Sequence, residues 1–171
     1  MQPRVPIRVI KLGGSLLELS DLQQRFHAWL GMQTPARNLI VTGGGKAVEA
    51  VRELDATHHF NSKFTHWLCV DLMSVMATLA SELLGLEQPL STPGELSDFL
   101  NGTLEIPAIA CVQPIAYYTP SIARQSNCSL PESWIAPVTQ SLLGLPVYLV
   151  LTNSSYSSRW KLRLRQPVVY H

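Results

Sequence analysis

Two segments near the N-terminus share one order of parts: a short apolar run, then glycines, then an amphipathic stretch. The first is VIKLGGS at residues 9–15, and the second is NLIVTGGG at residues 38–45. Strands that alternate with helices are typical of parallel sheets, because parallel strands are joined by crossover connections that cover the sheet. The repeated unit therefore predicts an α/β fold with a mainly parallel sheet.

The rest of the chain continues this alternation. A helix is predicted over residues 22–31, behind a capping Ser20 or Asp21, and a short helix follows the capping-box sequence TPGE at residues 92–95. Residues 106–112 and 147–152 read as buried strands, and the alternating tail after residue 154 reads as a half-exposed strand.

One longer helix is predicted over residues 64–84, where large apolar side chains recur every three or four positions. Gly85 follows as a plausible end of that helix. The recurring residues are Phe64, Leu68, Leu72, Val75, Leu79 and Leu83.

Composition limits the class of protein. A chain of 171 residues with 46% hydrophobic and 15% charged residues is expected to form a single folded domain. The net charge of +1 gives no global attraction to nucleic acid or to an anionic membrane, so any anion site must be local.

Three separated cysteines without a CxxC pair indicate reduced thiols and a cytoplasmic protein. The longest apolar run, residues 142–151, is too short to span a bilayer, and no secretory signal precedes Lys11.

The glycine clusters lie where open α/β sheets bind ligands, at the carboxyl ends of strands. Glycines allow backbone N–H groups to approach an anion closely, and the N-terminus of a following helix favours negative charge. Lys11 would add a full positive charge at the same edge, and Ser15 a hydroxyl donor. The alternative is that both clusters only reverse the chain. Neither fits the dinucleotide or P-loop patterns.

Taken in order, the two clusters resemble the amino acid kinase superfamily. The resemblance implies a three-layer sandwich of the carbamate kinase type and transfer of the ATP γ-phosphate, with Mg²⁺, to a small acceptor. It makes Lys11 the catalytic lysine that contacts the transferred phosphate, and it implies no metal-ligating side chain. The residues that it assigns to phosphate and substrate binding are Gly13, Gly14, Ser15, Gly43, Gly44 and Gly45.

The segment HWLCVDLMSVMATLASELLG, residues 66–85, looks like a small subgroup of that superfamily, which phosphorylates a furan alcohol phosphate in methanofuran biosynthesis. His66, Trp67 and Met73 match the helix of that subgroup. Residues 1–112 would then form the acceptor and phosphate part of one domain, and residues 130–171 a reduced nucleotide part. In that second part Thr139 matches a threonine of the family pattern, but the aspartate that accompanies it in the family is missing. Thr152 or Asn153 stands where the family pattern has a second lysine.

Two functions follow as hypotheses. The first is an ATP-dependent phosphotransferase that acts on a carboxylate, phosphate or alcohol phosphate. The alternative is an inactive kinase-fold remnant that binds phosphate or a metabolite, or serves in assembly. Either is compatible with a homodimer, because a shortened sheet leaves an edge to cover. His66 and Cys69 share a helical face but lack a third metal ligand, and Asp71 either lines the acceptor pocket or faces solvent.

Overall fold

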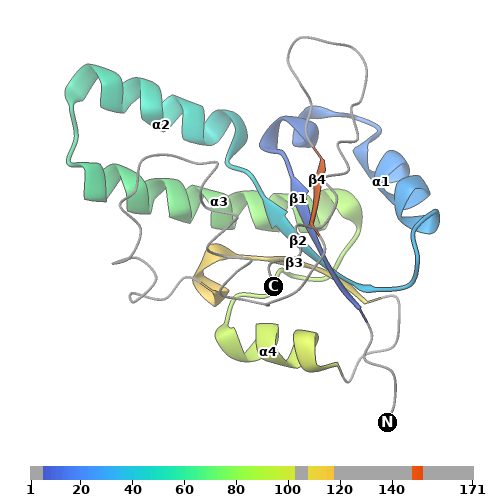
Figure 1. The fold of residues 1–171 in the computed structure, drawn as a ribbon. Coiled ribbons are helices and arrows are strands. Elements are labelled where there is room, and N and C mark those ends of the chain that lie inside the picture. Colours follow the sequence, from blue (N-terminus) through green and yellow to red (C-terminus); the bar gives the residue numbers. More distant parts are fainter. Residues whose placement is uncertain (1–5, 103–107, 118–147, 152–171) are drawn as a thin grey trace, which may run out of the picture.

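The computed structural model describes residues 6–102, 108–117 and 148–151 of the chain. It confirms an α/β fold built on an open parallel sheet (Figure 1). The strands stand in the order β3-β2-β1-β4, and every neighbouring pair is parallel. They are β1 (Ile7–Leu12), β2 (Arg37–Thr42), β3 (Ile109–Val112) and β4 (Tyr148–Leu151).

Four α-helices and two short 3-10 helices connect the strands in the described residues. The predicted helices over residues 22–31, 64–84 and 92–100 are all present, with bounds within two residues of those expected. Their bounds are α1 (Leu22–Gly31), α2 (Gly45–His58), α3 (Ser62–Leu84) and α4 (Pro93–Asn101), with η1 (Gly14–Glu18) and η2 (Pro114–Ala116). The predicted tail strand, Thr139, Thr152 and Asn153 lie outside the described residues.

Both faces of the sheet are covered by helix. On one face Val9 and its neighbours pack against Leu96 and Phe99 of α4. On the other face Ile10 and Leu12 pack against α1 and the C-terminal half of α3. Because successive side chains of a strand point to opposite faces, the alternating apolar residues of β1 supply both clusters. The described part of the chain is therefore a helix–sheet–helix arrangement.

Helix α3 lies across the carboxyl end of β2. The Thr42 hydroxyl donates a hydrogen bond to the main-chain carbonyl of Met73, at 3.4 Å. Trp67, near the start of α3, packs against the core of one face of the sheet, whereas Ala80 and Leu84 belong to the core of the other face. The helix thus passes over the sheet edge that carries the glycine turns.

The face that α3 buries is not the face with the large apolar residues. Its buried side chains are Val70, Ala77, Ala80, Ser81 and Leu84. Three of the five, Ala77, Ala80 and Ser81, are small and let this part of the helix approach the sheet closely, while Leu84 fills the core at the C-terminal end of the helix. Helix α3 also has the length and hydropathy of a membrane span. Its mean hydropathy is 1.5 over an 18-residue window, and 28% of that window is buried. Core helices of soluble proteins meet the same criterion.

The N-terminus of α4 has the capping box that the sequence predicts. The Thr92 hydroxyl accepts a hydrogen bond from the Glu95 N–H at 3.2 Å, and the Glu95 carboxylate accepts one from the Thr92 N–H at 3.0 Å.

We expect Thr92→Ala to lower the free energy of unfolding by about 1 kcal/mol, since an N-cap side chain satisfies an otherwise unpaired N–H. Urea titration measures the change. Gln24→Ala, at an exposed position of α1, is the control and should change stability by less than about 0.5 kcal/mol.

The same cap predicts a dependence on pH. Hydrogen bonds from the backbone N–H groups of Ser91 and Thr92 hold the pKa of the Glu95 carboxyl below its usual value. When folding lowers the pKa of a carboxyl group, that group stabilises the protein at pH values above its pKa in the unfolded chain. The contribution disappears as the pH falls through the pKa that the group has in the folded protein. The stability difference between the wild type and Glu95→Gln should therefore be largest near pH 7 and shrink below about pH 4. Urea titrations at pH 7, 5 and 3 test this, and an equal difference at all three would contradict it.

Candidate functional site

The two glycine turns leave the same edge of the sheet and touch each other. β1 and β2 pair in parallel register with Leu12 opposite Thr42, so the turns that follow begin side by side (Figure 1). The Gly43 N–H donates a hydrogen bond to the Leu12 carbonyl at 2.8 Å. The structure therefore brings together the six glycine and serine positions that the sequence singled out in two separate segments.

The contact between the turns leaves no room for side chains. A Cβ on Gly14 would overlap the backbone N and Cα of Gly45 and would lie 2.9 Å from the Gly43 carbonyl oxygen. Gly45 has a φ of +54°, which L side chains rarely adopt, and a Cβ there would lie 3.1 Å from the Gly14 carbonyl carbon. Tight main-chain packing thus requires glycine at both positions, whether or not an anion binds.

Several N–H groups at this contact have no backbone acceptor. Within the described residues, the N–H groups of Gly14, Ser15, Gly44 and Gly45 donate no backbone hydrogen bond. Gly14 is the first residue of η1 and Gly45 the first of α2, so these are the unpaired donors of two helix starts. The 14-residue helix α2 adds a partial positive charge at its N-terminus. Together these groups form a local surface that favours an anion.

Lys11 is the cation of this edge. It is half-buried in β1, where it pairs in register with Val41 of β2 and with Val150 of β4. Strand alternation places it on the same face as Val9. No hydrogen bond or ion pair joins its ammonium to any other residue in the described ranges. A half-buried ammonium without such a partner is suited to binding an external anion.

An ion pair between the two turns was not predicted from the sequence. The Lys46 ammonium lies 2.7 Å from the Glu18 carboxylate and so links the start of α2 to the end of η1. Both side chains are largely exposed, at 83% and 46%, and such a pair contributes about 0–1 kcal/mol. Its main effect on the site is electrostatic, because Glu18 offsets the charge that Lys46 would otherwise add beside the glycine turns.

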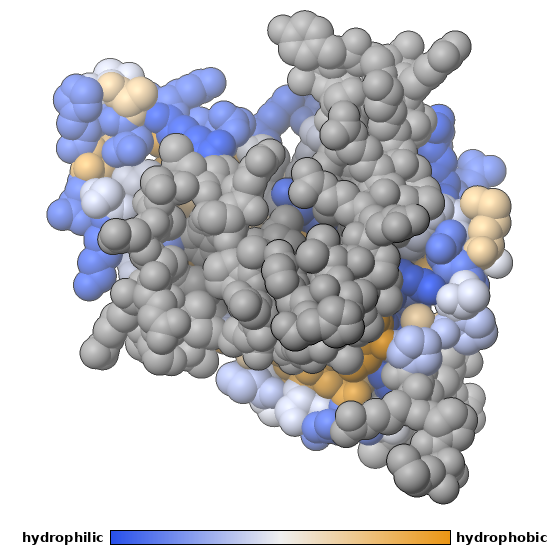
Figure 2. Space-filling model, viewed as in Figure 1, coloured by the Kyte–Doolittle hydropathy of each residue, from blue (hydrophilic) through white to orange (hydrophobic). Residues whose placement is uncertain are grey.

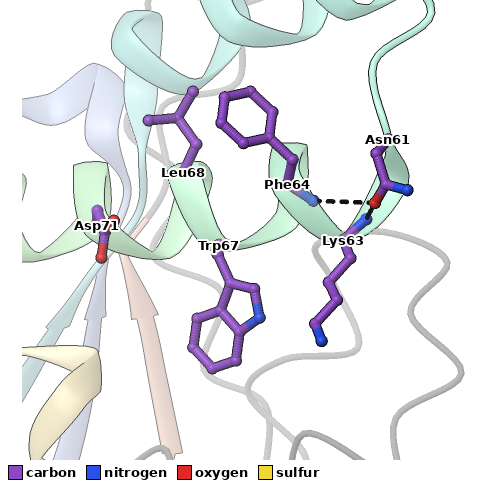
Figure 3. Close-up of a pocket in the computed structure, with 6 residues that line it drawn as sticks. All are labelled: Asn61, Lys63, Phe64, Trp67, Leu68 and Asp71. Atoms are coloured by element: carbon purple, nitrogen blue, oxygen red, sulfur yellow. Dashed lines mark hydrogen bonds between the residues drawn. The ribbon is translucent and has the colours of Figure 1, made fainter.

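A pocket of about 400 Å³ runs along the first half of α3 (Figure 3). Asp71 is exposed, as one of the two interpretations of the sequence expected, and its side chain lines this pocket. Asp71 lies within one helical turn of Met73. The Met73 carbonyl accepts the hydrogen bond from the hydroxyl of Thr42, which is the residue before the second glycine turn. The pocket is lined by Asn61, Lys63, Phe64, Trp67, Leu68 and Asp71.

The described residues contain no group of three or more His, Cys, Asp or Glu side chains that could hold a metal ion. His66 packs edge-on against Trp67, with ring centroids 5.6 Å apart, and burial lowers the pKa of its imidazole. Cys111 is buried in the core, which raises the pKa of its thiol to about 11.

Comparison with known protein families and with curated proteins finds no match to this sequence. The described fold itself defines an α/β protein with an open parallel sheet and two glycine turns at one edge of that sheet.

The Gly14–Gly45 contact can be tested by substitution. Gly14→Ala should lower the free energy of unfolding by about 1–3 kcal/mol, because the added methyl group must displace the backbone of Gly45. Gly31→Ala is the matched control, since a Cβ there meets nothing within 4 Å. Chemical denaturation of both variants measures the difference. Equal stability of the two would show that the turns are not in contact in solution.

Proposed function

We propose that the protein is a small-molecule kinase that binds the transferred phosphate of ATP at its two glycine turns. The observation that carries the proposal is that both turns meet at the sheet edge that holds Lys11, whose half-buried ammonium has no partner within the part of the chain that the structure describes. The resemblance to the amino acid kinase superfamily supports it and supplies the expectation of ATP, of Mg²⁺ and of a carbamate kinase-like sandwich. In this proposal the phosphate-binding residues are Gly13, Gly14, Ser15, Gly43, Gly44 and Gly45.

Phosphoryl transfer requires positioning and charge stabilisation more than covalent chemistry by the protein. An oxygen of the acceptor forms a bond to the γ-phosphorus while the bond to ADP breaks, and negative charge spreads over the phosphoryl oxygens. Fixed N–H donors and an ammonium stabilise that charge without reorganisation during the reaction. In this proposal the glycine-turn amides and Lys11 have those roles.

The pocket along α3 is the site proposed for the acceptor. The aromatic rings of Trp67 and Phe64 offer apolar contact area, while Lys63 and Asp71 offer one charge of each sign. Figure 3 shows the Lys63 and Trp67 side chains extending from the same side of the helix. A small molecule with a flat apolar part and an anionic group matches this lining, in keeping with a carboxylate, phosphate or alcohol phosphate acceptor.

A second candidate is a binding module that keeps the phosphate site without catalysis. It is favoured by two departures from the family pattern: the aspartate expected after Thr139 is missing, and Thr152 or Asn153 stands in place of the second lysine. Loss of one cation from a phosphoryl-transfer site can reduce the rate by roughly 10³ to 10⁵, by analogy with an arginine finger. Phosphate binding is common to both candidates, and turnover distinguishes them.

The Lys11 role is tested by calorimetry with inorganic phosphate and with Mg·ATP. Lys11→Ala should weaken binding about 10- to 100-fold, the equivalent of a charged hydrogen bond of about 1.5–3 kcal/mol. Arg52→Ala is the control, because it removes the same formal charge from α2 away from the turns. Binding of phosphate without ATP turnover would favour the binding module. Absence of binding by the wild type to either ligand at millimolar concentration would overturn the phosphate site itself.

A further inference from the structure

The Lys46–Glu18 ion pair joins the two elements that meet at the glycine turns. Glu18 is the last residue of η1, which follows the first turn, and Lys46 is the second residue of α2, which follows the second turn. The Lys46 ammonium lies 2.7 Å from the Glu18 carboxylate, although the two residues are 28 positions apart in the sequence. A cation and its partner carboxylate therefore lie directly beside the proposed anion site.

The Lys46 side chain is placed to reach an anion at the turns. Lys46 directly follows Gly45, and the N–H groups of Gly44 and Gly45 have no backbone acceptor in the described residues. Side chains of an α-helix tilt toward its N-terminus, so the Lys46 side chain leaves α2 on the side of the turns. The lysine stem is flexible and carries three rotatable donors. An anion held by these N–H groups would thus lie within reach of the Lys46 ammonium.

Glu18 holds Lys46 only weakly. The two side chains are 83% and 46% exposed, and an exposed ion pair contributes little because water and salt screen it. Figure 2 shows a mostly hydrophilic surface along α2, apart from the tip where the helix ends, so no apolar surroundings strengthen the pair. A terminal phosphate group carries up to two negative charges at neutral pH, against one on the carboxylate. Exchange of the carboxylate for a phosphate is therefore favourable.

We propose that Lys46 leaves Glu18 when phosphate binds and becomes the second ammonium of the site, so that Glu18 sets the affinity by competing for Lys46. This inference rests on the proposed phosphate site. Lys11 comes from β1 and Lys46 from α2, so the phosphate would contact one ammonium from the sheet and one from the helix. Lys46 is then a binding residue, and Glu18 is a positioning residue that acts through Lys46.

Calorimetric titration with inorganic phosphate at about 0.15 M salt tests the exchange. Lys46→Gln should weaken binding about three- to tenfold because it removes the second ammonium, and Glu18→Gln should tighten binding about threefold because it frees Lys46. The Glu49–Arg52 pair of α2 is the matched control, since its atoms are also 2.7 Å apart and it lies further along the helix. Glu49→Gln and Arg52→Gln should each change the affinity less than twofold. Circular dichroism checks that all four variants fold, and a Lys46→Gln variant that binds phosphate as tightly as the wild type would overturn the proposal.

The double variant Lys46→Gln with Glu18→Gln separates exchange from simple repulsion of the anion by Glu18. If Glu18 acts through Lys46, the double variant should bind phosphate with the same affinity as Lys46→Gln alone, because the two effects are coupled. If Glu18 only repels the anion, the threefold gain should persist without Lys46. That persistence would contradict the exchange.

Lys11→Ala, measured in the same titrations, distinguishes failure of this inference from failure of the phosphate site. Phosphate binding that weakens in Lys11→Ala but not in Lys46→Gln would remove only the role of Lys46 and leave the site in place. A wild type that binds no phosphate at millimolar concentration would overturn the site itself and the role of Lys46 with it.

Discussion

The main-chain contact between Gly14 and Gly45 is the interaction on which the described structure most depends. It joins the starts of η1 and α2, which follow neighbouring strands in parallel register. Any side chain at Gly14 would force the two turns apart. The same contact gathers N–H groups that have no backbone acceptor among the described residues, so the geometry that closes the sheet edge also supplies the donors of the proposed anion site. Packing and proposed function therefore require glycine for separate physical reasons.

Helix α3 joins this edge to the rest of the molecule. Its carbonyl at Met73 receives the Thr42 hydroxyl, and its small residues Ala77, Ala80 and Ser81 face inward. The large residues Val70 and Leu84 are buried as well, but most of the large apolar residues of α3 lie on the other side of the helix. On the outer face of α3, Phe64, Val75, Leu79 and Leu83 are consequently left about half exposed.

The local patterns were predictable from the sequence because each depends on nearby residues. The strand–glycine–helix units, the helix over residues 22–31 and the capping box at Thr92 and Glu95 are all of this kind. The inner face of α3 was not predictable in the same way. The helix is apolar on more than one side, so periodicity marks its large residues but cannot say which side meets the sheet. The Lys46–Glu18 ion pair, which spans 28 positions of sequence between exposed side chains, leaves no local pattern at all.

The charges around the glycine turns favour a single, localised anion. Lys46 is paired with Glu18, so its charge is largely offset at the outer rim. Lys11 has no such partner in the described residues and is half-buried, where the lower dielectric strengthens its attraction for an anion. With a net charge of only +1, the chain as a whole adds little long-range attraction. In the proposed function, selectivity at this edge therefore comes from the fit of a single phosphoryl group, such as the terminal phosphate of ATP, to the Lys11 ammonium and the fixed N–H groups.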